Sequence, residues 1–394
     1  MTEWIECTLD KLGEIVGGAT PSTKCEDYYG GSIPWITPKD LSSFKGRYIT
    51  SGERNITEKG LASCSAQMMP KDAVLFTSRA PIGYVAIASQ SVCTNQGFKS
   101  IVVNEKADPL FVYYLLKYNK DAIEAMGSGT TFKEVSGKTM RAVKVRIPVD
   151  VSYQKRIAAV LDSLDTKIEN NERINDNLLE QALTLYATHF SSVDKNGCIG
   201  DYCAVKSGFA FKSSWWTNNG VKVIKIGSIN QDNLNLLECS YVDEDKADKA
   251  KDFVVKAGDL LIAMTGATIG KFSMVPYSSE VLLVNQRVGK FFLGNHPVKK
   301  LPFIYCTLKQ PEVYNEVVNR GQGSAQPNIS ASDIMSIPCV IPSQDVINDF
   351  NDAAQPLFDL IISNQRENQQ LSELRNTLLP KLMSGELDVS NIDL

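Results

Sequence analysis

The sequence predicts an α+β protein made of two similar strand-rich globular heads and two long helices that pair as an antiparallel coiled coil. The first observation is an internal repeat, in which four short blocks recur in the same order at offsets between 187 and 194 residues. The second is a change of hydrophobic period after each copy, from short β-branched runs to a heptad pattern. Self-similarity at a fixed distance is the signature of duplication. The 394 residues are therefore expected to form two copies of one unit of roughly 190 residues.

The repeated blocks resemble one another in length and in their ends. Residues 127–148 read GSGTTFKEVSGKTMRAVKVRIP and residues 321–342 read GQGSAQPNISASDIMSIPCVIP, so both open G-x-G-[ST] and close on Ile-Pro. Upstream, KDAVLFTSRAPIGYV matches GDLLIAMTGATIGKF, and IPWITPKDL matches VKVIKIGSI. The fourth block is a dipeptide, Asn95-Gln96 in the first copy and Asn285-Gln286 in the second.

Each copy is expected to begin with a head, residues 1–149 in the first and 193–342 in the second. The runs AVLFT, GYVAIA, KSIVV, VKVIKI and LLIAM are bounded by Gly, Pro, Ser and Asn, which predicts mainly strands. Two stretches are the helical exceptions, LFVYYLLKYNKDAIEAM from Leu110 and LPFIYCTLKQPEVYNEVV from Leu301.

A long helix is expected after each head, in residues 150–192 and 343–394. Seam positions alternate spacings of four and three residues, which predicts a helix that packs on another helix. The first seam is Ile157, Leu161, Leu164, Ile168, Asn171, Asn175, Leu178, Ala182, Leu185 and His189. The second, 193 residues later, is Phe350, Ala354, Leu357, Ile361, Asn364, Asn368, Leu371, Arg375, Leu378 and Leu382.

Both seams carry two asparagines one turn apart at matching places, Asn171 and Asn175 in the first and Asn364 and Asn368 in the second. A buried Asn on a coiled-coil seam fixes the register, because a shifted partner would leave its amide unpaired. The simplest geometry is an antiparallel pair with the asparagines facing each other, a spacer of roughly 50–60 Å at ~1.5 Å rise per residue. The alternative is two unrelated amphipathic helices that lie on their own heads, with the asparagines facing water.

Composition is that of a soluble globular protein, with 43% hydrophobic and 22% charged residues. No apolar run approaches the ~18–20 residues of a membrane helix, and the start MTEWIECTLDKLGE has no signal-peptide pattern. The nine cysteines form no C-x-x-C pair, which predicts reduced thiols and a cytoplasmic location. The net charge of −4 is unevenly distributed: residues 1–150 and 191–342 carry +2 each, whereas 151–190 and 343–394 carry −2 and −6. The heads are thus nearly neutral, and charge does not exclude nucleic acid.

Catalytic signatures are absent from the sequence. The two histidines, His189 and His296, stand in no metal-binding spacing. Ser136-Gly137-Lys138-Thr139 resembles the end of a phosphate-binding loop, but Phe132 occupies the position of its first glycine, so we interpret it as a turn. We therefore predict no catalytic residue, no metal site and no cofactor bound by this chain.

Two binding heads on a fixed spacer can engage two half-sites at a set separation, as dimeric DNA readers do. Polar and basic side chains in the loops are the candidate DNA contacts. They are Lys39, Arg79, Lys99 and Lys133 in the first head and Lys225, Lys271, Arg287 and Asn328 in the second.

The order of strand-rich region, G-x-G-[ST] segment, Ile-Pro and heptad helix, repeated twice, resembles the specificity subunit of Type I restriction-modification enzymes. The helix openings IPVDVSYQKRIAAVLDSLDTKIENN and IPSQDVINDFNDAAQPLFDLIISN, and the ending LRNTLLPKLMSGELDV, are similar to the conserved regions of that family. Two departures are SQDVIND after the second Ile-Pro and Arg375 on the second seam, where a small or apolar residue is expected.

The resemblance implies that each head is a target recognition domain that reads one half of a split, asymmetric DNA sequence. It implies that the helices dock two modification subunits, which bind S-adenosylmethionine and methylate adenine in each half-site. Restriction subunits that use ATP and Mg would complete the complex. Two other classes stay open: a two-headed scaffold that binds proteins, and an enzyme of unrecognised type with two sites. For the second, the matching Asn-Gln pairs could equally be structural amides at strand ends.

Overall fold

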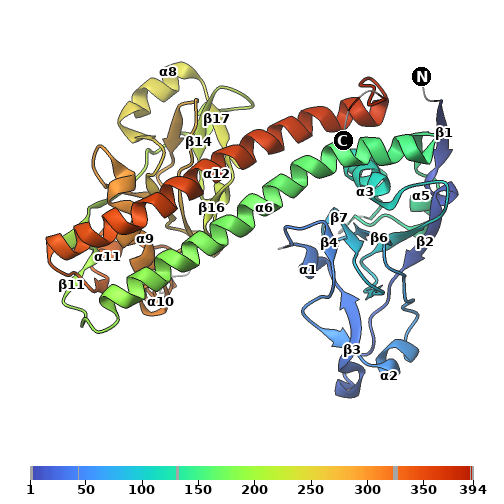
Figure 1. Cartoon of the computed structure of the whole chain (residues 1–394), viewed down its shortest axis with the longest axis horizontal. Helices are drawn as coiled ribbons and strands as arrows, with labels where there is room; N and C mark the ends of the chain where they lie inside the picture. The colour runs from blue at the N-terminus through green and yellow to red at the C-terminus, as the bar shows by residue number, and fades with distance from the viewer. Residues whose placement is uncertain (1–2, 43, 130–132, 323–326, 391, 393–394) are drawn as a thin grey trace. The chain divides into compact units, whose positions relative to one another are not determined.

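The chain forms two compact units in the computed structural model (Figure 1), which describes residues 3–42, 44–129, 133–322, 327–390 and 392. The first unit consists of residues 1–169 and 371–394, and the second of residues 170–370. Each unit therefore holds one strand-rich region and a part of each long helix. The boundaries expected from the sequence follow the change from strands to helix, whereas the compact units divide both long helices.

The first unit is built on a five-stranded sheet in the order β2-β9-β6-β7-β4, beside a three-stranded sheet β5-β3-β8 and the pair β1-β10. The bounds of its strands are β1 Trp4–Thr8, β2 Gly13–Gly17, β3 Tyr29–Ile36, β4 Tyr48–Ile49, β5 Asn55–Ile56, β6 Val74–Ser78, β7 Ile82–Ala88, β8 Cys93–Thr94, β9 Lys99–Val103 and β10 Lys144–Pro148.

The second unit has a four-stranded sheet β12-β22-β19-β20, a five-stranded sheet β13-β17-β14-β21-β18 and the pairs β15-β16 and β11-β23. The bounds of its strands are β11 Gly197–Cys198, β12 Val205–Ser207, β13 Trp216–Thr217, β14 Val221–Ile224, β15 Ile229–Asn230, β16 Asn233–Leu234, β17 Ser240–Val242, β18 Val254–Val255, β19 Leu260–Ala263, β20 Phe272–Met274, β21 Leu282–Val284, β22 Val288–Phe291 and β23 Pro338–Cys339.

The strand pairings of the two units repeat each other. The order β2-β9-β6-β7 corresponds to β12-β22-β19-β20, and the parallel pair β3-β8 corresponds to the parallel pair β14-β21. One offset differs from the sequence alignment: β6 and β19 align at 186 residues rather than 187, since Val74 pairs with Ile101 and Leu260 with Phe291. β7 and β20 keep the offset of 187, since Val74 pairs with Ile87 and Leu260 with Met274, so the second unit has one additional residue between these strands. The β6–β7 pairing is also irregular between Phe76 and Ser78, whereas the β19–β20 pairing is regular.

Each unit also contains shorter helices. The shorter helices of the first unit are α1 Pro38–Ser42, α2 Glu58–Ala62, α3 Pro109–Tyr118, α4 Lys120–Ala125 and α5 Gly137–Arg141. Those of the second are α7 Ile199–Tyr202, α8 Glu244–Ala247, α9 Leu301–Lys309, α10 Pro311–Gly321 and α11 Ala331–Met335. The stretch Ser136–Thr139, expected to be a turn, instead begins α5: the Ser136 hydroxyl accepts a hydrogen bond from the Thr139 amide and caps the helix.

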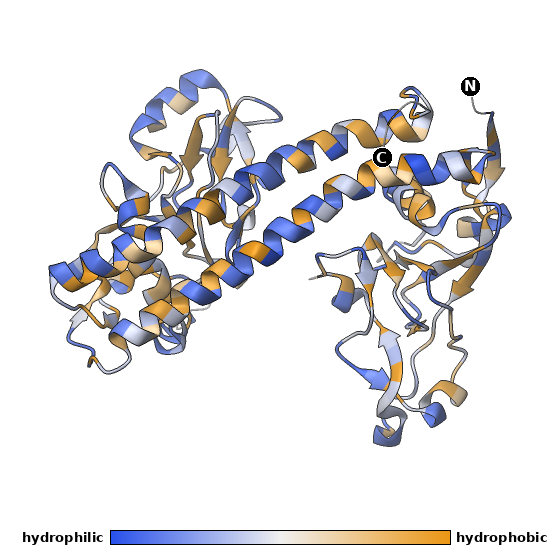
Figure 2. Ribbon diagram, in the orientation of Figure 1, coloured by the Kyte–Doolittle hydropathy of each residue, from blue (hydrophilic) through white to orange (hydrophobic). Residues whose placement is uncertain are grey.

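The long helices are α6 Val151–Phe190 and α12 Gln344–Ser384, drawn green and red in Figure 1. In the second unit Asn171 Nδ2 donates to Asn368 Oδ1 at 2.9 Å, and Asn364 Nδ2 donates to Asn175 Oδ1 at 2.8 Å. Residue numbers rise along one helix as they fall along its partner, so the pairing is antiparallel. Apolar and polar residues alternate along both helices (Figure 2). The α+β class and the paired long helices are confirmed, and the alternative of two separate amphipathic helices is excluded.

At the end of α6 the expected seam residue His189 contacts the facing seam residue Phe350, with ring centroids 5.8 Å apart, but His189 is exposed. Tyr186 and Phe190 beside it are buried, at 4% and 2% exposure. Both rings pack edge-on against Phe350 of α12, with centroids 5.6 and 5.3 Å away. The reason is geometric: an α-helix of 3.6 residues per turn drifts ~20° per heptad relative to a strict 3.5-residue seam. The buried face has therefore moved by the last turn.

Substituting the paired asparagines Asn171 and Asn368 tests their structural role. Asn171→Leu alone is expected to lower the free energy of unfolding by about 1–3 kcal/mol, because Asn368 and Glu367 lose the amide that donates to them. Changing both Asn171 and Asn368 to Leu is expected to recover most of that loss, since removing both partners of a buried hydrogen bond is nearly neutral. Urea denaturation of the two single variants and the double variant measures the coupling. Additive losses would show that the pair does not interact.

The chain's C-terminal segment completes the first unit. After Gly385, whose φ is +78°, the chain turns back along the start of α6. Asp388 accepts a hydrogen bond from the Tyr153 hydroxyl at 2.8 Å, and Val389 is fully buried. Arg156 donates to three main-chain oxygens of the same segment, those of Val389, Ser390 and Ile392. The ending that resembles the family's conserved pattern is thus part of the first unit's core.

All nine cysteines are free thiols, and five of them are buried. Among the described helices, none is both long and apolar enough to cross a membrane.

Candidate nucleic-acid interface

The four repeated blocks meet in space around one turn in each unit, Asn95–Gly97 in the first and Asn285–Arg287 in the second, which we call the Asn-Gln turn. The Asn95 amide donates to Ile36 O at 3.0 Å, and its Oδ1 accepts from the Gly97 amide at 2.8 Å. The Asn285 amide donates to Ile224 O at 3.0 Å, and its Oδ1 accepts from the Arg287 amide at 3.2 Å.

Asparagine favours such turns because its side chain hydrogen-bonds the backbone two residues on. The two asparagines are therefore structural amides, as one of the sequence alternatives held. The glutamine that follows each of them is exposed in both units.

The other two repeated blocks reach the same turn through a continuous path of backbone hydrogen bonds. In the first unit the Ser78 amide donates to Gly97 O at 2.7 Å, and the Val135 amide donates to Ser78 O at 2.9 Å. In the second, the Met264 amide donates to Arg287 O at 3.0 Å, and the Ile329 amide donates to Met264 O at 2.9 Å. We call the surface formed by the turn, the residue after Ser78 or Met264, and the neighbouring part of the 22-residue block the recognition edge.

The recognition edge of the first unit is basic around a single carboxylate. Glu134 lies 3.4 Å from Arg79 Nη1 and 3.7 Å from Lys99 Nζ, and it pairs through its backbone with Ser128. Burial lowers the pKa of Lys99, an effect that Glu134 partly offsets. Lys133 is exposed beside them. The structure thus brings two of the four candidates of the first head, Arg79 and Lys99, together at Glu134, and Lys133 is the neighbour of Glu134 in the chain.

The recognition edge of the second unit is more polar than charged. Asn328 is exposed and pairs through its backbone with Thr265, and its amide donates to Gly321 O at 2.9 Å. Gly266, with φ of +72°, lets the chain turn there, and its amide donates to Pro327 O at 3.0 Å. Arg287 is exposed on the Asn-Gln turn itself. Two of the four candidates of the second head, Arg287 and Asn328, therefore share one edge.

The other three candidates have different surroundings. Lys39 is exposed and pairs with Glu53 at 2.7 Å. Lys225 lies over the Trp216 ring with Nζ 3.4 Å from the centroid, and burial lowers its pKa. Lys271 is half-buried before β20, with its backbone bonded to Ala263 and Thr268. None of these three is joined to a recognition edge by the hydrogen bonds described above.

Sequence reasoning did not include Gln96, Gln286 or Glu134 among the candidates. The repeat held the signal for all three. The two glutamines are identical at an offset of 190, and Glu134 stands at the position of Asn328 at an offset of 194. Comparing equivalent positions of the two copies shows what the units share and where they differ. Both units have an exposed Gln, whereas Glu134 in the first unit is replaced by Asn328 in the second. In the described residues, no group of three or more His, Cys, Asp or Glu side chains could hold a metal ion.

Comparison with known proteins agrees with the duplication. The model of the Type I restriction modification DNA specificity domain matches the chain twice, over residues 1–180 and 194–373. The chain belongs to this family. The Type I restriction enzyme MjaIX specificity subunit of Methanocaldococcus jannaschii is 32% identical, over 99% of this chain and 95% of that protein. The MjaVIII specificity subunit of the same organism is 21% identical, over 99% and 94%.

The fold is likewise shared within the family. The crystal structure of a Type I restriction-modification S subunit from M. genitalium aligns with a TM-score of 0.55 at 17% identity, covering 97% of this chain and 96% of that one. Each family match spans one unit's strand-rich region and most of the long helix that follows it in sequence. The recognition edges therefore lie within the matched regions, one in each.

Proposed function

We propose that the chain is the sequence-specific DNA recognition subunit of a Type I restriction-modification complex, in which each head reads one half of a split, asymmetric site. Membership of the family supports this role. The observation that carries the proposal is the duplicated recognition edge: the two units present an exposed Gln on equivalent hydrogen-bonded turns, next to side chains that differ between the units. Gln, Asn and Arg recognise bases by bidentate hydrogen bonds in the major groove, and Glu accepts from cytosine.

The small charge of the chain fits a complex in which other subunits supply much of the affinity for DNA and this chain supplies the choice of sequence. Phosphate neutralisation supplies much of the affinity of DNA-binding proteins, whereas the heads carry only a slight positive excess. Base contacts supply sequence choice without bulk charge. We therefore expect the isolated chain to bind DNA weakly and the specificity to emerge with its partners. Tight, sequence-specific gel shifts by the chain alone would contradict that expectation.

The partners are part of the proposal. The paired helices α6 and α12 would dock two modification subunits that bind S-adenosylmethionine and methylate adenine in each half-site. Restriction subunits that use ATP and Mg would join them in the cytoplasm. The chain itself supplies neither the methyl donor nor the nuclease in this assignment.

The test is a map of methylated adenines in the host genome, with and without this reading frame. We expect one split, asymmetric motif to lose its methylation on deletion and to regain it when the frame is restored. A second candidate, the two-headed protein scaffold, predicts no change in methylation and a purified complex whose DNA affinity is weak at every salt concentration. Loss of a motif together with steep salt dependence excludes that candidate.

A further inference from the structure

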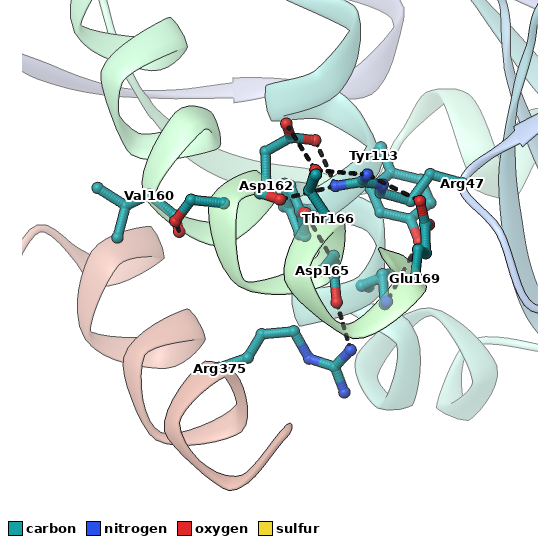
Figure 3. Close-up of polar contacts among 11 residues, drawn as sticks. Arg47, Tyr113, Val160, Asp162, Asp165, Thr166, Glu169 and Arg375 are labelled. Carbon is teal, nitrogen blue, oxygen red and sulfur yellow. Dashed lines mark hydrogen bonds and ion pairs between the residues drawn. The ribbon is translucent and has the colours of Figure 1, made fainter. Parts of the chain in front are cut away.

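Arg47 is a buried cation in the first unit, and its guanidinium hydrogen-bonds residues of α6. Its side chain is 7% exposed although it belongs to the loop before β4. Nη1 donates to the main-chain oxygen of Asp162 at 2.9 Å and pairs with the Asp162 carboxylate. Nη2 donates to Thr166 Oγ1 at 2.9 Å and to Glu169 Oε2 at 3.0 Å. Figure 3 shows the guanidinium directed at these side chains, which occupy successive turns of one helix.

A second layer ties the same helix to α12. Asp165 is 6% exposed; it accepts a hydrogen bond from the Tyr114 hydroxyl of α3 at 2.8 Å and from Arg375 Nη1 of α12 at 2.6 Å. Arg375 is the residue that departs from the apolar seam, and Figure 3 shows it reaching Asp165. Its charge therefore has a partner on α6. Together the loop of Arg47, helix α3, α6 and α12 form one polar network, which we call the first anchor.

The second unit has an anchor of a different kind: the main chain of Asp232 reaches a long helix, whereas its carboxylate, 32% exposed, is held by side chains of α9. Asp232, at φ of +63°, lies in the turn between β15 and β16. Its main-chain oxygen accepts from Gln365 Nε2 of α12 at 3.1 Å, and its carboxylate accepts from the Tyr305 hydroxyl and pairs with Lys309. Tyr305 and Tyr114 occupy the same position of the repeat, four residues after Leu301 and Leu110. The equivalent tyrosine thus serves an anchor in each unit.

Buried charged networks act more on geometry than on stability. Taking charges out of water offsets much of their mutual attraction, so such a network favours the one arrangement in which every partner is met. A head that rotated on the helices would separate Arg47 from three α6 side chains at once. The first anchor therefore opposes rotation of the first head relative to α6. In the second unit the carboxylate of Asp232 fixes the turn whose main-chain oxygen binds Gln365 of α12, so it acts on the head angle through that turn.

Rotation of a head matters for a split DNA site. With 10–10.5 base pairs per turn of about 34–36 Å, one additional base pair in the gap moves a half-site by roughly 3.4 Å and turns it by about 35°. A complex whose heads are held at fixed angles cannot contact both half-sites after that displacement. A complex in which one head can rotate can adjust to part of the displacement.

We propose that Arg47 and Asp232 are positioning residues that hold their heads at a fixed angle on the helix pair, so that the complex accepts one gap length between the half-sites. This inference rests on the proposed function and adds the structural origin of gap selection.

The test uses the complete complex with its modification subunits. The substrates are unmethylated DNA duplexes that carry the motif found by the methylation map, with the native gap or with one base pair more or fewer. The wild type is expected to prefer the native gap by about a hundredfold, since misplacement of a reacting group by ~1 Å already has an effect of that size. In Arg47→Met the preference is expected to fall to about tenfold, while methylation at the native gap stays within a few-fold. Asp232→Asn, which keeps a residue suited to positive φ, is expected to reduce the preference similarly.

The matched control is Arg54→Met, the same substitution at an exposed arginine of the first unit, which should keep the wild-type preference. Asp162 and Glu169 are about one-third exposed, so water can solvate them when Arg47 is removed and the fold should persist. The inference is overturned if both Arg47→Met and Asp232→Asn keep the wild-type gap preference. If Arg47→Met no longer methylates DNA, Arg47→Lys takes its place, and wild-type gap preference in Arg47→Lys and Asp232→Asn overturns the inference. If the wild-type complex methylates no split duplex, the proposed function itself fails.

Discussion

The paired substitution of Arg287 and Asn328 by Ala is expected to abolish recognition of one half of the DNA site while the other half is still read. Both side chains are exposed on the recognition edge of the second unit. A bidentate contact to a base contributes about 1–3 kcal/mol of discrimination, so losing two should lower site-specific binding by at least about thirtyfold. Mapping methylated adenines in cells that carry the variant measures the effect as a motif that is relaxed in one half.

The reciprocal variant is Arg79→Ala with Lys133→Ala in the first unit, which should affect the other half of the motif. Lys251→Ala, at an exposed lysine of the second unit, serves as the control for charge and folding. A phosphate contact would behave differently: binding would weaken equally on cognate and random DNA, and the salt slope would fall by about one per contact. A uniform loss of that kind would show that the recognition edge positions the DNA without reading its bases.

The sequence was most informative where the signal is periodic or repeated. The two heptad seams predicted the helices α6 and α12, and the matched asparagines predicted an antiparallel pair, because each signal depends only on residues of one helix. The repeated blocks revealed the duplication for a similar reason. The structure explains why those blocks resemble each other: all four contribute to the Asn-Gln turn, where the backbone and side chain of Asn95 and of Asn285 make the same hydrogen bonds.

The recognition edges could not be assembled from the sequence, since they depend on pairings between distant segments. Ser78, Gly97 and Val135 are joined only once β6 and β9 pair. The one-residue difference between β6–β7 and β19–β20 also shifts the alignment in this region. Individual lysines gave little information: Lys39 and Lys99 look alike in sequence, yet Lys39 is exposed beside Glu53 and Lys99 is half-buried beside Glu134.

The contacts of the anchors were even harder to predict from the neighbouring sequence. Arg47 belongs to a short loop with no pattern, and its burial follows from the tertiary packing of that loop on α6. Arg375 was noticed as an exception on the second seam, and an exception of this kind is informative. A charged residue at a seam position requires a partner on the facing helix, and position 165 on the first helix carries a carboxylate. Pairing the two seams from the matched asparagines outward brings Asp165 opposite Arg375.

The largest effect on stability is expected from Lys117, a lysine of α3 beside the first anchor. Burial lowers its pKa to about 8 from an ordinary value of 10.5, with Arg375 and Arg47 adding to the decrease and Asp165 and Glu169 opposing it. Below pH 8 the folded protein must keep a partly buried ammonium. The unfolded chain binds the proton more strongly between about pH 8 and pH 10.5, so this group makes stability rise with pH across that window.

Lys117→Met removes the buried charge and keeps the length of the side chain. The pKa difference corresponds to roughly 3 kcal/mol at ~1.4 kcal/mol per unit, and loss of the hydrogen bond from Lys117 Nζ to the Tyr113 hydroxyl opposes it by about 1 kcal/mol. We therefore expect the variant to be about 2 kcal/mol more stable than wild type at pH 7. The advantage should disappear as the pH approaches 10, where the wild-type lysine is neutral.

The difference between variant and wild type is the quantity to measure, by urea denaturation from pH 7 to 10. Several thiols and phenols, among them Cys203 and Tyr186, have pKa values raised to about 12 by burial, and their titration lowers stability at high pH in both proteins. Taking the difference removes that background. Lys120→Met, at an exposed lysine of the next helix, should show no such dependence. A pH-independent difference for Lys117→Met would mean that Lys117 reaches water in the folded protein, and that the pocket beside Asp165 and Arg375 is solvated.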